Sequence, residues 1–368
     1  MRRADLRLWR TVVFCAGLLA GSTYLSADAV AQKKLEKVTL GQVTSTSLTF
    51  APVFAAQTLG FFADEGIELQ HLNFQGGSVL QPQIANKQVM FGFTAVELAI
   101  MSRQPGKDPI PLVFFYNGAR ESIWETVVLD SSPIKSLSDL RGKKIGIGAT
   151  ANANVPLTRA MLHDLGMEVT RDYSFLPIGV GAPAFRAVQN GDVDAYNTFD
   201  SNIATFEMTG VKLRKLEVPQ KYRELFSNGF VAHQDTLRDK PELVAGFGRA
   251  LTKGIIVCGE NPSFCVRNFW KLYPNAKPQA ASDEDALKKG LHILQSRMQK
   301  YTYFAPNAKR EFGIYSDQTW KHYVDALYEG GELSTKDINL NGLYTNDFVA
   351  KFNDFNVDKV RKMARSLN

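Results

Sequence analysis

Short apolar segments of strand length alternate along the chain with longer segments that carry apolar residues at helical spacing. In one helical segment, Leu157, Met161 and Leu165 are four residues apart and Gly166 follows them, as at many helix C-termini. Regular alternation of this kind predicts an α/β fold with largely parallel sheets and helices on both faces. The expected strands are residues 37–43, 67–74, 89–93, 110–116, 126–129, 143–148, 173–177, 192–199 and 230–233.

The alternating pattern occurs twice and is followed by helices. Residues 37–127 and 130–228 have the same order of strands and helices, and from Pro241 the pattern is helical to the C-terminus. Extended segments at 126–129 and 230–233 bracket the second repeat, and they are predicted to be two crossover strands that form a hinge. The predicted lobes are residues 32–128 together with 229–368 and the C-terminal helices, and residues 129–228.

The segment from Thr49 to Ser78 has the clearest local signals. Pro52 stands where a first helical turn tolerates a missing N–H group, and Gly60 is expected to end that helix. The following strand runs into Gly76, Gly77 and Ser78, a glycine-rich start of another helix. Two helix N-termini then open at the same edge of one sheet, and their free N–H groups suit an anion or a polar head group.

The N-terminal 31 residues have the pattern of a secretory signal peptide. Four arginines precede an uncharged run at 11–27, and small residues at Ala29 and Ala31 form a cleavage site. The run is short for a membrane anchor, which is the alternative. Loss of the segment's four basic and two acidic residues would lower the net charge from +6 to +4. Such mild, scattered charge argues against nucleic-acid binding.

Two cysteines, Cys258 and Cys265, remain after the predicted cleavage. In an oxidising compartment they could form a disulfide, and two free buried thiols are the alternative. The histidines have no metal-ligand spacing with one another or with cysteine, so no metal site is expected. No phosphate-binding loop or serine-nucleophile motif occurs in the sequence. The sequence therefore predicts no catalytic residue and no cofactor.

Six motifs occur in a recognisable order along the chain. They are Phe-Ala-Pro-Val-Phe-Ala-Ala at 50–56, Gly-Phe-Phe-Ala-Asp-Glu-Gly-Ile-Glu-Leu at 60–69, Gly-Gly-Ser at 76–78, residues 136–148, Gln-Asn-Gly-Asp-Val-Asp-Ala at 189–195 and Leu-Tyr-Thr-Asn-Asp-Phe at 343–348. Together they resemble the NMT1/THI5-like substrate-binding proteins, a group that includes nitrate, sulfonate and taurine binders. The resemblance implies a periplasmic binding protein of type II, with two α/β lobes around a ligand cleft. It also implies an ABC permease in the inner membrane, with a separate ATPase subunit, as the partner.

Candidate ligand contacts in the first lobe are polar or glycine residues that follow strands. Hydroxyl and backbone N–H groups after the first strand could hold a polar head group, although serine and threonine also cap helices there. Glycines let a ligand approach the backbone closely, although a plain turn would also use them. The candidates are Ser45, Thr46, Ser47, Phe50, which could stack on the ligand, Gly76, Gly77, Ser78 and Thr94.

The facing candidates come from the second lobe. Thr150, Asn152 and Asn154 lie in a polar loop after a strand. Asp200 could accept hydrogen bonds from a ligand amine, or it could cap the helix that it begins. Trp124 is the favoured aromatic candidate, ahead of Tyr116 and Phe199, because it precedes the first crossover strand.

The sequence thus predicts a monomeric periplasmic protein that is not an enzyme. It would capture a sulfonate, an aromatic carboxylate or a pyrimidine-like compound in the interlobe cleft by hinge closure. Two alternatives stay open. One is an enzyme like the pyrimidine-precursor synthases of the same family, although those carry a cysteine-rich iron motif. The other is a ligand-binding sensor that docks on a membrane receptor.

Overall fold

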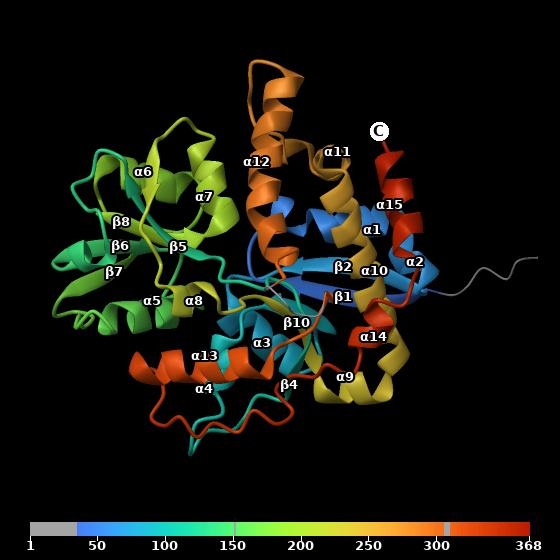
Figure 1. The fold of residues 1–368 in the computed structure, drawn as a ribbon, viewed down its shortest axis with the longest axis horizontal. Coiled ribbons are helices and arrows are strands. Elements are labelled where there is room, and N and C mark those ends of the chain that lie inside the picture. Colours follow the sequence, from blue (N-terminus) through green and yellow to red (C-terminus); the bar gives the residue numbers. More distant parts are fainter. Residues whose placement is uncertain (1–34, 151, 305–309) are drawn as a thin grey trace, which may run out of the picture. The chain divides into compact units, whose positions relative to one another are not determined.

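The protein contains two five-stranded sheets whose strands are arranged with the same topology (Figure 1). The computed structural model describes residues 35–150, 152–304 and 310–368. The first sheet has the order β2-β1-β3-β10-β4 and the second has the order β7-β6-β8-β5-β9. In each sheet four strands run in the same direction, and the strand that the chain enters from the other sheet (β10 or β5) runs antiparallel to its two neighbours. The strands are β1 (Glu36–Gln42), β2 (Ile67–Asn73), β3 (Phe91–Thr94), β4 (Leu112–Asn117), β5 (Trp124–Leu129), β6 (Lys143–Ile147), β7 (Tyr173–Pro177), β8 (Ala195–Phe199), β9 (Leu213–Lys215) and β10 (Gly229–His233).

The helices begin and end at local signals in the sequence. Pro52 lies in the first turn of α1, and Gly191 in the left-handed region ends α6. The α-helices are α1 (Ala51–Thr58), α2 (Phe61–Asp64), α3 (Gly77–Ala85), α4 (Glu97–Met101), α5 (Asn154–His163), α6 (Ala182–Asn190), α7 (Asp200–Glu207), α8 (Gln220–Arg223), α9 (Gln234–Asp239), α10 (Pro241–Glu260), α11 (Pro262–Leu272), α12 (Asp283–Tyr301), α13 (Asp317–Glu329), α14 (Val349–Phe352) and α15 (Val357–Arg365).

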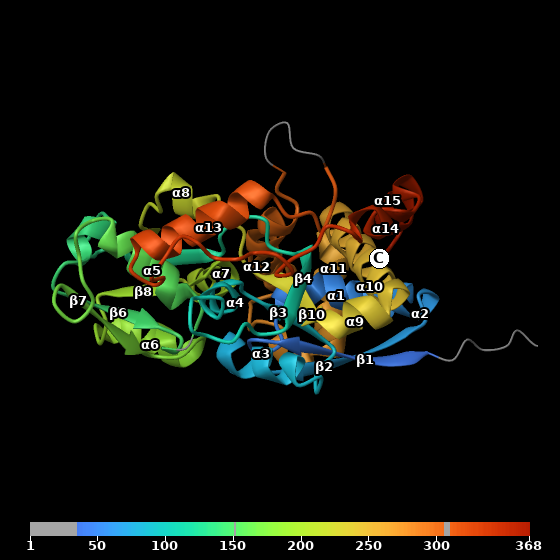
Figure 2. The ribbon, with the colours of Figure 1, turned by 90° about the horizontal axis from the view of Figure 1, so that it is seen from below.

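Apolar side chains bury both faces of each sheet. One cluster joins the first sheet to α1, α10, α11 and α12, and another joins its opposite face to α3, α4 and α13. Leu157, Ala160 and Met161 of α5 also belong to the α13 cluster, although α5 follows a strand of the second sheet. Figure 2 shows α13 alongside α5, and α12 packs on α7. The C-terminal helices therefore contact helices of both sheets.

The predicted α/β fold class agrees with this architecture, and the structure refines the predicted hinge. Each of the two predicted crossover strands is an integral member of one sheet. β5 pairs with β8 and β9, and β10 pairs with β3 and β4. The chain passes between the sheets at residues 118–123 and 216–228. We propose that the two sheets mark the two predicted lobes, although β5 begins at Trp124 and places the first boundary a few residues earlier.

Cys258 and Cys265 form a disulfide with Cα atoms 5.5 Å apart. Both residues are buried, and the bond joins the end of α10 to the start of α11. It supports the disulfide alternative rather than two free thiols.

Replacing both cysteines with alanine is expected to lower the free energy of unfolding by about 2 kcal/mol, because the bond closes only a short loop in the unfolded chain. Urea denaturation of the oxidised protein and the double variant would measure the difference. Reduced wild-type protein should match the variant. Equal stability of the oxidised protein and the double variant would show that the crosslink contributes nothing.

The predicted signal peptide lies outside the described residues. No helix within the described ranges combines the length and the apolar character needed to cross a membrane. Within the same ranges, no group of three or more histidine, cysteine, aspartate or glutamate residues could hold a metal ion.

Candidate functional site

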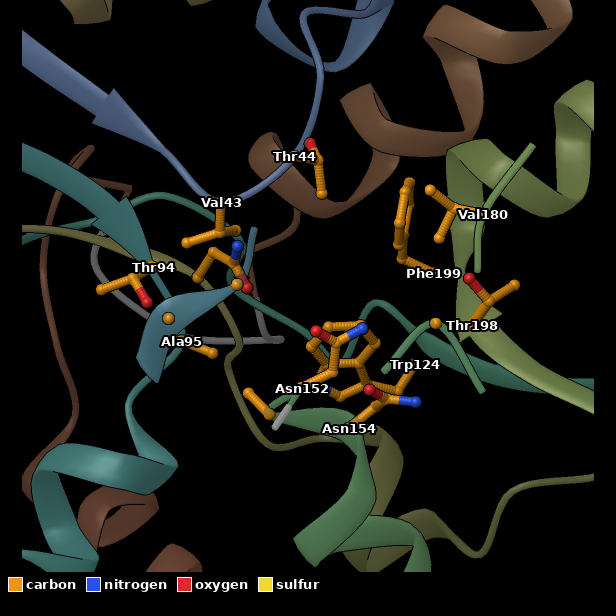
Figure 3. A pocket seen from close by; sticks show the side chains of 15 residues that line it. Val43, Thr44, Thr94, Ala95, Trp124, Asn152, Asn154, Val180, Thr198 and Phe199 are labelled. Carbon is orange, nitrogen blue, oxygen red and sulfur yellow. The ribbon is translucent and has the colours of Figure 1, made fainter. Parts of the chain in front are cut away.

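The candidate site is a cavity at the carboxyl ends of strands from both sheets, which is where open α/β sheets bind ligands. Its volume is about 470 Å³, including space open to solvent, and small-molecule sites typically have about 300–1,000 Å³. β1, β3, β6 and β8 lead into it, and Trp124 at the start of β5 and Asn228 in the second connection between the sheets complete it (Figure 3). It is lined by Val43, Thr44, Gly76, Gly77, Thr94, Ala95, Trp124, Gly148, Asn152, Ala153, Asn154, Val180, Thr198, Phe199 and Asn228.

Glycine allows close packing on the first-sheet side of the cavity. Gly76 has a φ of 97°, which favours glycine. A Cβ on Gly77 would lie 2.8 Å from the Thr94 hydroxyl oxygen, so this position needs glycine as well. The Gln81 side chain donates to the Thr94 hydroxyl oxygen over 3.5 Å and to the Ala95 carbonyl over 3.1 Å. Thr94 thereby keeps its own hydroxyl proton available to donate.

Amides and a hydroxyl form the second-sheet side. A Cβ on Gly148 would lie 2.5 Å from the Asn152 amide nitrogen, so glycine makes room for that side chain. The Asn202 amide donates to the Thr198 hydroxyl oxygen over 3.2 Å, and Thr198 also interacts with the Tyr196 hydroxyl. Asn154 is 1% exposed and begins α5. This side therefore offers neutral hydrogen-bonding groups.

Two aromatic side chains lie next to each other in the cavity wall. Trp124 begins β5 and Phe199 ends β8, and these residues are cross-strand partners in the antiparallel register. Side chains at opposed positions lie on the same face of a sheet and within reach of each other. Figure 3 shows both rings at the cavity, with Trp124 close to Asn152 and Asn154 and with Phe199 close to Val180. They provide an apolar surface suited to a planar ligand.

Among the described residues that line the cavity, none has an ionisable side chain. Behind Trp124, the fully buried Glu97 accepts a hydrogen bond from the Tyr323 hydroxyl over 3.0 Å. Burial raises the pKa of Glu97 to about 7, although hydrogen bonds from the backbone, Tyr323 and the Trp124 indole partly offset this. The Trp124 indole nitrogen is buried and has no hydrogen-bond partner of ordinary geometry among the described residues. Because no ionisable side chain is among the described lining residues, a neutral ligand is compatible with the cavity.

A smaller cavity of about 310 Å³ adjoins the first and shares five of its lining residues, among them Trp124 and Phe199. Arg297 of α12 and Phe50 also line it. Arg297 donates to both carboxylate oxygens of Asp200, over 2.5–3.1 Å, and each side chain is 2% exposed. Next to this pair, the hydroxyls of Thr49 and Ser201 are 2.8 Å apart. These polar contacts join α12 and the short helical turn that precedes α1 to α7.

Asp200 was predicted to accept hydrogen bonds from a ligand amine, but its carboxylate is not free for that role. The Arg297 guanidinium already engages both of its oxygens. A carboxylate that is buried this deeply needs a cation and hydrogen bonds. Neither its side chain nor that of Arg297 lines the main cavity.

The structure brings together about half of the predicted contacts. Those that line the main cavity are Gly76, Gly77, Thr94, Trp124, Asn152 and Asn154. Their contact with a ligand stays a prediction.

The other predicted contacts lie elsewhere. Ser45, Thr46 and Ser47 are displaced from the main cavity, and the neighbouring Thr44 takes their place. Thr46 instead exchanges hydrogen bonds with Asn73.

Three further candidates also differ from their predicted place. Phe50 is buried against Phe93, with ring centroids 5.6 Å apart, and lines only the smaller cavity. Ser78 lies on a separate groove with Pro82 and Leu98. Thr150 is exposed and outside the lining.

Sequence reasoning missed or ranked lower several lining residues, notably Thr198, Phe199 and Asn228. Thr198 and Phe199 end a strand of the second sheet, as Thr94 does in the first, so their position was a usable signal. Tyr116, which was weighed equally with Phe199, is a core residue whose hydroxyl is 2.9 Å from that of Thr252. Asn228 carries no comparable signal because it lies in an irregular connection.

A family model described as NMT1/THI5 like matches residues 47–264, more than half of the chain. The chain belongs to the NMT1/THI5-like family. The resemblance predicted from the sequence motifs is therefore confirmed.

Relatives of this NMT1/THI5-like protein include binding proteins and enzymes. It is 25% identical over 324 residues to the riboflavin-binding protein RibY of Chloroflexus aurantiacus, covering 87% of this chain and 88% of that protein. It is also 25% identical over 258 residues to the 4-amino-5-hydroxymethyl-2-methylpyrimidine phosphate synthase of Legionella pneumophila, covering 66% of this chain and 74% of the synthase.

Among solved structures, the periplasmic aliphatic sulphonate binding protein SsuA of Escherichia coli matches with a TM-score of 0.61 and 15% identity. The match covers 84% of this chain and 91% of the SsuA chain. This likeness shows the fold, and it confirms the predicted fold class.

Proposed function

We propose that this protein is the solute-binding component of an ABC importer and captures a small polar organic molecule in the cavity between its two sheets. The family, the fold and the position of the cavity support this proposal. Ligand capture would close the two proposed lobes about their connecting segments. The contacts of α12 with α7 would then form part of the closed state.

The residues that line the cavity decide which of the three predicted ligand classes fits best. Its described lining combines the Trp124 and Phe199 rings with hydroxyls, amides and backbone groups, and it includes no cationic side chain. A sulfonate or carboxylate would bring a full negative charge into this setting, which is costly without a paired cation. Of the three predicted classes, the pyrimidine-like nitrogen compounds, which are planar and uncharged, fit this lining best.

The remaining parts of the proposal follow the sequence. Export by the predicted signal peptide would place the protein in the periplasm as a monomer, without a cofactor. An inner-membrane permease with a separate ATPase subunit would receive the ligand. A sensor that docks on a membrane receptor would use the same binding step, so the genes next to this one are the test between transport and sensing.

The similarity to a pyrimidine phosphate synthase keeps an enzyme as the second candidate. The cysteines argue against it. Of the three cysteines in the chain, Cys258 and Cys265 are bound to each other, which leaves only Cys15 of the predicted signal peptide. The chain thus has no free cysteine cluster for the iron motif that the family resemblance associates with those enzymes.

Thermal unfolding in the presence of a ligand panel would test the proposal. The panel is riboflavin, uracil, 4-amino-5-hydroxymethyl-2-methylpyrimidine, taurine, benzoate and nitrate. At least one uncharged nitrogen heterocycle is expected to raise Tm, because a ligand at 100 times its Kd stabilises the folded state by about 2.7 kcal/mol. Phe199→Ala should reduce this shift by removing one wall of the cavity.

The matched control is Tyr328→Ala, since Tyr328 is an exposed aromatic residue on α13 and outside the cavity lining. It should leave the shift unchanged. A Tm increase with taurine, benzoate or nitrate alone would reject the heterocycle class but keep a binding protein. No shift with any compound would reject the binding proposal.

A further inference from the structure

Asn154 places a hydrogen-bond acceptor in the cavity wall that has no partner within the described protein. Its amide nitrogen donates to the Asn197 side-chain oxygen over 2.5 Å and to the Asn197 carbonyl over 3.3 Å. Its own side-chain oxygen, Oδ1, is buried and accepts no hydrogen bond from the described residues. Figure 3 shows this side chain at the cavity beside Asn152 and Trp124.

The orientation of the Asn154 amide follows from the residues behind it. Asn197, which is fully buried on β8, uses its amide nitrogen to donate to the Glu125 carbonyl over 3.3 Å and to the Thr126 hydroxyl over 2.9 Å. A backbone carbonyl can only accept, so the Asn197 nitrogen must face β5 and its oxygen must face Asn154. The Asn154 nitrogen then faces Asn197, and Oδ1 is the atom left for the cavity.

The hydrogen bonds that run from Asn154 through Asn197 to β5 fix which atom of the Asn154 amide faces the cavity. Buried polar atoms in proteins are almost always hydrogen-bonded, and leaving one unmet is unfavourable. The Asn154 oxygen cannot gain a partner by flipping its amide, because the flip would set two oxygens against each other at Asn197. Because no described residue supplies a donor, the donor would come from the cavity side.

The Thr94 hydroxyl has the opposite character. Its oxygen already accepts a hydrogen bond from the Gln81 side-chain amide, so it retains a proton to donate. The lining thus combines one fixed acceptor with a hydroxyl donor. That combination complements an amide or imide edge, in which an N–H group stands beside carbonyl oxygens.

We propose that Asn154 determines ligand specificity by accepting a hydrogen bond from a ring N–H of the ligand, in an orientation that the Glu125 carbonyl fixes through Asn197. This inference rests on the proposed function and narrows its ligand class. A heterocycle with an N–H flanked by a carbonyl would bind. Anions that offer only acceptors, such as nitrate or a simple sulfonate, would place their own oxygens against the Asn154 oxygen, and no hydrogen bond could form between them.

Matched probe pairs test the proposal. Riboflavin and 3-methylriboflavin, and uracil and 3-methyluracil, differ only in whether one ring nitrogen carries hydrogen or methyl. Isothermal titration with the full chain should show that methylation weakens binding about tenfold to hundredfold for at least one pair. In Asn154→Ala the ratio of the two affinities should fall towards one, because the variant loses the acceptor and gains room for the methyl group.

The buried asparagine Asn268 on α11 lies away from the cavity and provides the control. Asn268→Ala should keep the wild-type ratio, and thermal unfolding without a probe would establish that both variants are folded. If a probe binds but methylation has no effect, or the penalty persists in Asn154→Ala, the role of Asn154 is overturned while the proposed function stands. Binding of nitrate or benzoate without either parent heterocycle would overturn the role of Asn154 as well. No binding by any compound would reject the proposed function itself.

Discussion

Replacing Arg297 with methionine is expected to lower the free energy of unfolding by about 3–5 kcal/mol, because it leaves the Asp200 carboxylate buried without its cation. The two side chains are each 2% exposed and share three hydrogen bonds. Water cannot replace the lost guanidinium at this depth. The methionine keeps most of the volume of the side chain, so the effect would come from charge rather than from a cavity.

Urea denaturation of the wild type, Arg297→Met, Asp200→Asn and the double variant would measure this effect. The double variant should be more stable than Arg297→Met, since removal of both charges also removes the uncompensated one. An exposed pair provides the control. Lys277 and Asp283 are 39% and 94% exposed, and Lys277→Met should change stability by less than about 1 kcal/mol. A similarly small effect at Arg297 would contradict the interpretation of a desolvated pair.

The pair also has a consequence for ligand capture. It joins α12, which packs on the first sheet through α11 and α1, to α7, which follows a strand of the second sheet. Loss of Arg297 should therefore weaken the contact between α12 and α7 at the back of the smaller cavity. Any ligand identified by the thermal screen should bind Arg297→Met more weakly if closure uses this contact.

Replacing Glu97 with glutamine is expected to stabilise the protein at pH 8 by about 3 kcal/mol and to leave its stability at pH 4 nearly unchanged. Burial raises the pKa of Glu97 from 4.5 to about 7. Between these values the folded state holds a proton that the unfolded chain has lost. The stabilising contribution is thus complete below pH 4.5 and is lost as pH rises to 7, whereas glutamine resembles the protonated carboxyl at every pH.

The difference in unfolding free energy between wild type and Glu97→Gln, measured in urea from pH 4 to 8, isolates this group from the other titrating residues. Tyr323 from α13 and Trp124 from β5 face the carboxylate, and neither changes charge in this range. The exposed Glu68 on β2 gives the control variant Glu68→Gln, which should follow the wild-type profile. A constant difference between wild type and Glu97→Gln at all pH values would show that Glu97 stays charged when buried.

Local signals in the sequence were enough to predict most elements of the fold. The apolar run at 110–116 corresponds to β4 (Leu112–Asn117), and the helix expected from Asp200 is α7 (Asp200–Glu207). The prediction missed β9 (Leu213–Lys215), an edge strand. Its residues Leu213, Arg214 and Lys215 have no buried apolar run, because only one neighbouring strand and little core lie against it.

The candidate site was predicted only in part, because only some of its residues have a local signal in the sequence. Gly76, Gly77 and Thr94 were predicted because each lies at a turn or a strand end, which can be recognised from a few neighbouring residues. Phe199 and Trp124 are far apart in the sequence, and their adjacency depends on the register between β5 and β8. A local sequence pattern does not predict how β5 and β8 are aligned with each other.

By itself, the sequence determined the family, the α/β class, the positions of most strands and helices, and the glycines that let the backbone approach the cavity. These features depend on the hydrophobic period and on the conformations that individual residues allow. Only the tertiary structure decided which polar groups remain available to a ligand. Asp200 is engaged because Arg297, 97 residues later, reaches it, whereas Asn154 keeps an open acceptor because Asn197 and the Glu125 carbonyl fix its amide. Hydrogen bonds and charges are satisfied by whichever group packing brings near, and packing joins residues that the sequence keeps far apart.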